Sequence, residues 1–252
     1  AKPPVETQPK TAAPKTEPVP KPKSVKLEQL RWQVNGESVP WSDVRAALDD
    51  ARVVLVGERH TSVLDHGVQL ALMKALAERE TSDAWMLGLE AVQMPFQSAL
   101  DAFGRGEISL KQLVKRIEYK ERWGYPLSLY GPLFESAKKQ GWPILALNAP
   151  SEWTRVVGRY GVTRATSAFA LDLPDIDVSD AAHKRFVLAK LRQHPGMSEA
   201  ILENYYAAQV LWDTTMAQRI EGASEDHRVF AVAGIAHVAY GLGISQRFST
   251  AL

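Results

Sequence analysis

The sequence predicts an α/β fold: a mainly parallel sheet flanked by helices, with a helical cap. Short apolar runs alternate with segments of helical periodicity, the pattern of parallel strands joined by crossovers. Two of these runs end in the same pattern, Gly-x-x-His, over 57–60 and 234–237. The segment of about 151–222 contains no convincing strand and is too long for a simple crossover. We therefore expect it to form the cap.

The elements can be assigned in order along the chain. Asn35-Gly36 is typical of a type I′ hairpin turn. The candidate N-caps are Ser42 and Asp43 for the first helix and Thr61 or Ser62 for the second. Gly104-Arg105-Gly106 breaks the helical region over 95–119 into two pieces. The expected elements are a hairpin over 31–39, strands over 52–56, 84–89, 143–147 and 228–233, and helices over about 43–49, 63–80, 95–119, 128–140, 151–160, 179–192 and 197–220.

The first 26 residues differ from the rest in composition. They contain seven of the 15 prolines, six lysines, two glutamates and no aromatic residue. Such a segment buries too little apolar surface to offset the entropy of ordering, so residues 1–26 are expected to be a disordered tether and 27–252 the folded domain. The tether has a charge of +4 (six minus two), which leaves −3 of the total +1 for the domain. A nucleic-acid partner is therefore not expected.

The amino terminus suggests export. The chain begins at Ala1 without an initiator methionine, as expected if an upstream signal was removed and a lipid anchor lies upstream of Ala1. The expected location is then the periplasm or outer membrane, although a cloning boundary would explain Ala1 equally well. The chain has no cysteine, which excludes disulfides and thiolate chemistry.

Polar residues at the strand ends form the candidate site. Glu58 and His60 follow the first strand, Glu90 follows the second, and His237 follows the last. Open α/β sheets bind ligands at the carboxyl ends of their strands, and imidazoles with carboxylates suit a metal ion or acid–base chemistry. The alternative is that each histidine only satisfies backbone groups at a helix start. His66 could line the pocket or the helix flank.

The long helix over 197–220 has an aromatic stripe. Tyr205, Gln209, Trp212 and Met216 lie on one helical face, which is compatible with simple packing or with the wall of a planar ligand. The same helix carries Tyr206, and a tyrosinate is in general a good ligand for ferric haem. Further aromatic side chains come from Trp123, Tyr125 and Tyr130, whereas His183, His194 and His227 have charged surroundings and are expected to be exposed.

Together these residues resemble the ChaN-like haem-binding lipoproteins, which share a superfamily with the Tiki proteases, the TraB proteins and the erythromycin esterases. The resemblance extends from about 50 to 248. The matching motifs are Gly57-Glu58-x-His60, His66, Gly88-Leu89-Glu90, Ala146-Leu147-Asn148, the helix from Tyr205 to Ala217 that contains Ala208-Gln209-x-x-x-Asp213, and Gly234-Ile235-Ala236-His237-Val238.

The resemblance implies a membrane-tethered protein of bacterial iron or haem uptake that binds ferric haem at a homodimer interface. Tyr205 or Tyr206 would ligate the iron, and Arg59 could pair with a propionate. His60, Gln209 and His237 would complete the haem-binding residues, and an outer-membrane haem receptor would be a partner. We favour this non-catalytic hypothesis but leave an enzyme open. The rival is a metal-dependent hydrolase of the Tiki kind, with His60, His237 and Glu90 as ligands of a divalent metal, and Glu58 or Glu90 activating water.

Overall fold

The computed structural model describes residues 21–22, 24–78, 84–192 and 197–248. The expected tether, 1–26, lies outside these ranges apart from residues 21, 22 and 24–26. No helix in the described ranges is both long and apolar enough to cross a membrane.

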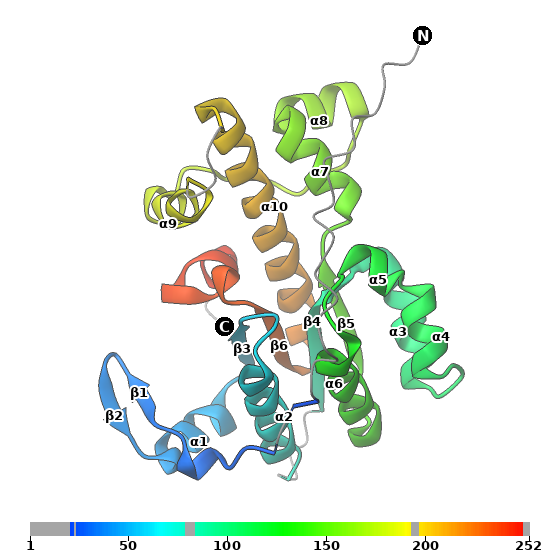
Figure 1. Ribbon diagram of the computed structural model, residues 1–252, viewed down its shortest axis with the longest axis vertical. Helices are drawn as coiled ribbons and strands as arrows, with labels where there is room; N and C mark the ends of the chain where they lie inside the picture. The colour runs from blue at the N-terminus through cyan, green and yellow to red at the C-terminus, as the bar shows by residue number, and fades with distance from the viewer. Residues whose placement is uncertain (1–20, 23, 79–83, 193–196, 249–252) are drawn as a thin grey trace.

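The central sheet is parallel and has four strands in the order β3-β6-β4-β5 (Figure 1). This confirms the predicted fold class. Strand β6, the last in the sequence, lies between β3 and β4. The two Gly-x-x-His turns, which follow β3 and β6, are therefore at the ends of neighbouring strands. The strands are β3 (Val53–Glu58), β4 (Trp85–Gln93), β5 (Ile144–Asn148) and β6 (Arg228–Gly234).

Strand β4 is longer than the sequence suggested. It was expected to end at 89, but it continues to Gln93, so Glu90 lies within the strand. Ala91 and Val92 are buried and extend the apolar run past the carboxylate. The register with β5 shifts between Leu89 and Gln93, and the Glu90 side chain therefore leaves the sheet beside an irregularity of the backbone.

Helices cover both faces of the sheet. One face, which includes Leu87 and Phe230, packs against α2 (Val63–Ala77), α3 (Gln97–Gly104) and α6 (Leu127–Gln140). The other face, which includes Val229, packs against Met216 and Ile220 of α10 (Glu199–Ser224). Burial of these alternating side chains drives the sheet to form between two helical layers.

The cap lies beyond the carboxyl end of the sheet, at the top of Figure 1. It consists of α7 (Ser151–Tyr160), α8 (Val162–Phe169), α9 (Ala181–Leu191) and the first half of α10 (Glu199–Ser224). Helix α8 was not predicted. Because α10 continues from the cap onto the face of the sheet, one rigid element joins the two parts.

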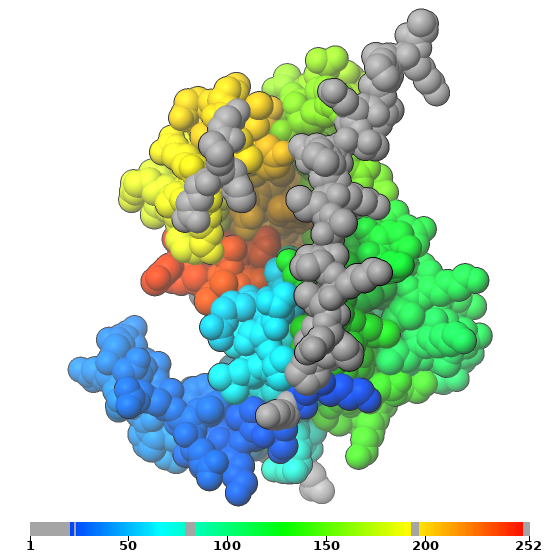
Figure 2. Space-filling model, viewed as in Figure 1, coloured from blue at the N-terminus to red at the C-terminus, as the bar shows by residue number. Residues whose placement is uncertain are grey.

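The amino-terminal hairpin projects from the body at the lower left of Figures 1 and 2. Asn35 and Gly36 both have positive φ, 52° and 88°, as the predicted type I′ turn requires. The predicted cap at Ser42 or Asp43 was wrong, because the next helix already begins at Trp41, after Pro40. The bounds are β1 (Trp32–Val34), β2 (Glu37–Val39) and α1 (Trp41–Asp50).

Short helical segments complete the described chain. They are η1 (Leu27–Gln29), η2 (Met94–Phe96), α4 (Leu110–Arg116), α5 (Tyr119–Arg122), η3 (Ile235–His237), η4 (Ala239–Gly241) and η5 (Gly243–Arg247).

Candidate functional site

The two Gly-x-x-His turns pack against each other through their glycines. A Cβ on Gly57 would lie 2.5 Å from Val238 Cγ2, and one on Gly234 would lie 2.8 Å from the His60 ring. Neither glycine has a positive φ, so a left-handed backbone is not the reason for glycine here. Each glycine instead allows the other turn to approach closely.

Glu58 is the buried anchor of the first turn. Gln69 of α2 donates to Glu58 Oε2 at 2.7 Å, and the Tyr130 hydroxyl of α6 donates to Oε1. His60 Nδ1 lies 3.0 Å from the same Oε1, and His66 Nδ1 lies 3.6 Å from Oε2. Side chains from two helices therefore hold this carboxylate in one orientation.

His60 is the accessible member of this cluster, with 25% of its side chain exposed. Its ring centroid lies 4.9 Å from that of Trp123 and 4.6 Å from that of Tyr125. Because Nδ1 faces the Glu58 carboxylate, the favoured tautomer leaves a lone pair on Nε2. His60 can therefore accept a proton or present one nitrogen to a metal.

A second cluster joins the sheet to α10. His237 Nδ1 lies 2.6 Å from Asp213 Oδ1 of α10, and Nε2 lies 3.3 Å from Glu90 Oε1 of β4. Glu90 also accepts a 2.6 Å hydrogen bond from the backbone N–H of Gly234, the glycine that contacts His60. The structure thus brings Glu58, His60, Glu90 and His237 to one edge of the sheet, in two clusters that meet at Gly234.

Mutual charge stabilises the second cluster. Burial alone would lower the pKa of His237, but Glu90 and Asp213 outweigh it and raise that pKa to about 10. Burial would raise the pKa of Glu90, yet His237 holds it below the ordinary value. At neutral pH His237 is therefore an imidazolium ion between two carboxylates.

The second cluster continues into the cap through His183, which was predicted to be exposed. That prediction was wrong: His183 is fully buried, and its Nε2 lies 3.3 Å from Asp213 Oδ2. Arg247 and the Tyr206 hydroxyl approach its Nδ1, at 3.3 and 3.5 Å. Burial lowers the pKa of His183, with Asp213 opposing the shift and Arg247 adding to it. In Figure 2 the yellow surface of α9 accordingly meets the red surface that contains η5.

The two candidate haem tyrosines occupy different environments. Tyr206 is fully buried, its hydroxyl donates to Asp180 O at 3.2 Å, and burial raises its pKa to about 12. Tyr205 is 38% exposed and lies against Gly158 of α7. One helical turn after Tyr205, the Gln209 amide lies 2.9 Å from His237 Nδ1. The face of α10 that carries Tyr205 therefore points toward the two clusters at the carboxyl ends of the strands, which together form the strand-end site.

Arg59 is already engaged. Its guanidinium contacts both carboxylate oxygens of Asp65, at 2.7 and 3.0 Å, while 68% of its side chain stays exposed. Burial would raise the pKa of Asp65, but Arg59 and Ser62 lower it to about 2. A propionate would have to compete with Asp65 for this guanidinium group.

Of the remaining histidines, the structure describes His66 and His227. His66 is buried, with Nε2 3.2 Å from the His60 carbonyl and its ring edge-on to Tyr130, so it supports His60 from within. His227 is half-buried, and His194 lies outside the described residues. Within those residues, no three or more His, Cys, Asp or Glu side chains are arranged to hold a metal ion.

Three members of these clusters were not assigned a role from the sequence: Asp213, Gln69 and Arg247. Asp213 had a usable signal, because it lies four residues after Gln209 and therefore on nearly the same helical face. Gln69 and Arg247 had none, since only the folded chain brings α2 to Glu58 and η5 to α9.

The stability of the chain should fall as the pH rises from 7 to 10. A pKa raised from 6.5 to about 10 means that folding favours protonated His237. Its contribution is complete below pH 6.5 and is lost as the pH approaches 10; at about 1.4 kcal/mol per pKa unit it amounts to a few kcal/mol. Urea unfolding of the wild type and His237→Gln at several pH values would measure this. The same pH slope in both proteins would refute the assignment.

Comparisons with known proteins identify the family and the fold. The family model described as "Haem-binding uptake, Tiki superfamily, ChaN" matches residues 44–248. A solved structure described as "Cofacial heme binding to ChaN of Campylobacter jejuni" is similar, with a TM-score of 0.65 and 18% identity over 84% of this chain and 81% of that chain. A weaker similarity, with a TM-score of 0.47 and 18% identity, covers 82% of this chain and 33% of RRSP, a MARTX toxin effector domain from Vibrio vulnificus.

No curated protein matches the sequence. The family model, however, covers well over half of the chain, from α1 to the end of the described residues. The chain therefore belongs to the haem-binding uptake family of the Tiki superfamily, the family of ChaN.

Proposed function

We propose that this chain binds ferric haem on the face between its cap and the strand-end site, as an exported, membrane-tethered protein of bacterial haem or iron uptake. The observation that carries the proposal is the family match over residues 44–248. In the similar Campylobacter jejuni structure, haem binds cofacially to ChaN, and a second copy of the chain would complete such an arrangement here.

The chemistry of the accessible side chains fits haem. Tyr205 presents a phenol at the surface, and a phenolate is an established ligand of haem iron. Tyr206 is the poorer candidate, because burial raises its pKa and its hydroxyl is already bonded inside the cap. We therefore assign the iron to Tyr205. Bound haem would supply a ferric centre able to accept this oxygen.

The segments that follow β3 and β6 expose apolar side chains. Leu64 is 56% exposed, Ile235 is 48% exposed and Tyr240 is 86% exposed. Tyr240 also has a left-handed backbone, φ 61°, which is uncommon for a residue with a large side chain. Several exposed apolar side chains near one site suggest a binding face, and a porphyrin or the second copy would cover them.

The metal-dependent hydrolase is the weaker candidate. A metal ligand needs a free imidazole lone pair, but each ring nitrogen of His237 faces a carboxylate. Among the described residues, the Glu58–His60 pair favours hydrolysis, because His60 could act as a base.

Titration with hemin, followed by visible absorption, tests the proposal. We expect a Soret band that saturates at a fixed ratio of hemin to protein, together with no ester or peptide hydrolysis above that of His60→Ala. Hydrolysis that is abolished in His60→Ala, with a hemin spectrum no different from that of free hemin, would instead support the hydrolase.

A further inference from the structure

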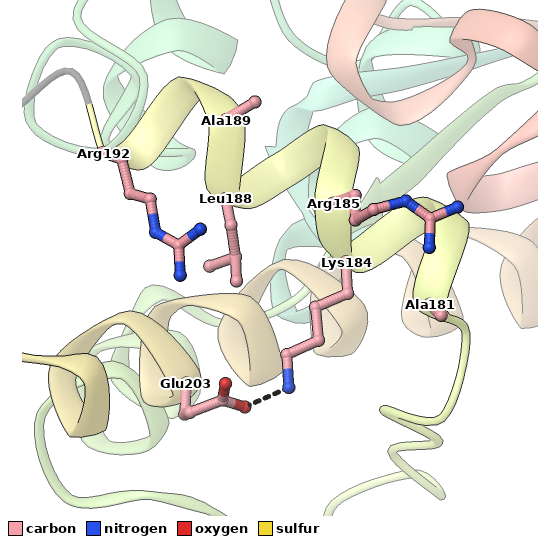
Figure 3. Close-up of a pocket in the computed structure, with 7 residues that line it drawn as sticks. All are labelled: Ala181, Lys184, Arg185, Leu188, Ala189, Arg192 and Glu203. Atoms are coloured by element: carbon pink, nitrogen blue, oxygen red, sulfur yellow. Dashed lines mark ion pairs between the residues drawn. The ribbon is translucent and has the colours of Figure 1, made fainter.

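A groove of about 360 Å³ lies between α9 and the first half of α10, outside both clusters of the strand-end site (Figure 3). Leu188, which is 6% exposed, lies at its centre, with Ala181 and Ala189 also lining it. In Figure 3 Lys184 and Arg192 extend toward α10 on either side of Leu188. The groove thus combines an apolar floor with cationic walls.

The charge of α9 is one-sided. Residues 181–192 contain four Lys or Arg residues and no Asp or Glu, in a chain whose formal charge is only +1. Three of these cations line the groove, namely Lys184, Arg185 and Arg192, against one lining carboxylate, Glu203. The lining residues therefore carry an excess of two positive charges, which favours an anion.

The three cations differ in how firmly they are paired. Lys184 Nζ lies 2.6 Å from Glu203 Oε2, a contact that joins the two helices. Arg192 lies 3.1 Å from Glu199, but these side chains are 56% and 73% exposed, and such a pair contributes little. Arg185 has no ion pair with any residue that the structure describes. Two guanidinium groups can therefore accept a ligand at small cost.

We propose that this groove binds a small amphiphilic anion, with a phosphate or carboxylate head at Arg192, a short apolar chain over Leu188, and Arg185 adding positive charge at the far rim. The two arginines are seven residues apart and share a helical face, and guanidinium groups bind such oxyanions through paired N–H donors. The volume is within the range of small-molecule sites. Binding in this groove does not depend on haem.

Calorimetric titration of the full chain with octyl phosphate tests this proposal. We expect saturable binding that weakens as salt is added, and much weaker binding of inorganic phosphate or octanol, each of which supplies half of the ligand. Arg185→Ala/Arg192→Ala should weaken octyl phosphate binding by about tenfold or more. Glu203→Gln, which removes the competing carboxylate, should strengthen it.

The matched control is Arg155→Ala/Arg164→Ala, which removes two exposed cap arginines outside the groove; its affinity should equal that of the wild type. Equal weakening in both double variants would overturn the site in favour of general charge attraction. If inorganic phosphate bound as tightly as octyl phosphate, the proposed contact between the apolar chain and Leu188 would be refuted. If the chain bound anionic phospholipid vesicles but not monomeric octyl phosphate, the proposal would be overturned and the groove would instead be a contact surface for membranes.

Discussion

Replacing Asp213 with alanine is expected to lower the free energy of unfolding by about 3–5 kcal/mol, the range for removing one partner of a buried ion pair. Asp213 is fully buried and lies 2.6 Å from His237 and 3.3 Å from His183. The substitution would leave His237 with Glu90 as its one close carboxylate and would remove the charged contact between α10 and the turn after β6.

Urea unfolding at pH 7, followed by circular dichroism, measures this loss. Asp213→Asn is the matched control: it keeps the shape and one acceptor but removes the charge, so its loss should be smaller than that of alanine. A third variant, Glu199→Ala, removes an exposed carboxylate of the same helix and should change stability by less than about 1 kcal/mol. Wild-type stability in Asp213→Ala would show that the buried cluster does not hold the cap to the sheet.

Tyr205→Phe should weaken haem binding on the order of a hundredfold, equivalent to about 3 kcal/mol, whereas Tyr206→Phe should leave it nearly unchanged. The first substitution removes the exposed phenol that we assign to iron. The second removes the hydrogen bond to Asp180 O and a longer contact with His183 Nδ1, which should lower the free energy of unfolding by about 1 kcal/mol.

Hemin titrations and urea unfolding of both variants form a crossed comparison. Tyr205→Phe should lose affinity and keep its stability, and Tyr206→Phe should do the reverse. A loss of haem affinity confined to Tyr206→Phe would show that Tyr206, inside the cap, ligates the iron. Helix α9 would then have to shift to admit the haem. Equal losses in both would argue that neither phenol acts alone.

Much of the fold follows from local patterns in the sequence. The apolar runs predict all four sheet strands to within a few residues, and Asn35-Gly36 predicts the hairpin turn. Their order in the sheet could not be read from the sequence. The insertion of β6 between β3 and β4 depends on long-range pairing, which has no local signature.

The candidate site was only partly predictable for the same reason. Strand ends marked His60 and His237 and their partners Glu58 and Glu90, but Gln69, Tyr130 and Asp213, which complete the clusters, come from helices far along the chain. His183 was misassigned because Lys184 and Arg185 beside it are polar, although its spacing to Val187 places both on the buried face of α9. Tyr205 and Tyr206 could not be separated by sequence, since neighbouring positions on a helix differ in burial only once α7 and α9 pack.

Resonance Raman spectroscopy of the hemin-loaded protein would identify the iron ligand itself, because it distinguishes a phenolate from an imidazole. We predict iron–phenolate bands in the wild type and in Tyr206→Phe, and their loss in Tyr205→Phe. Imidazole ligation that disappears in His60→Ala would be incompatible with Tyr205 as the ligand and would place the iron at the strand ends.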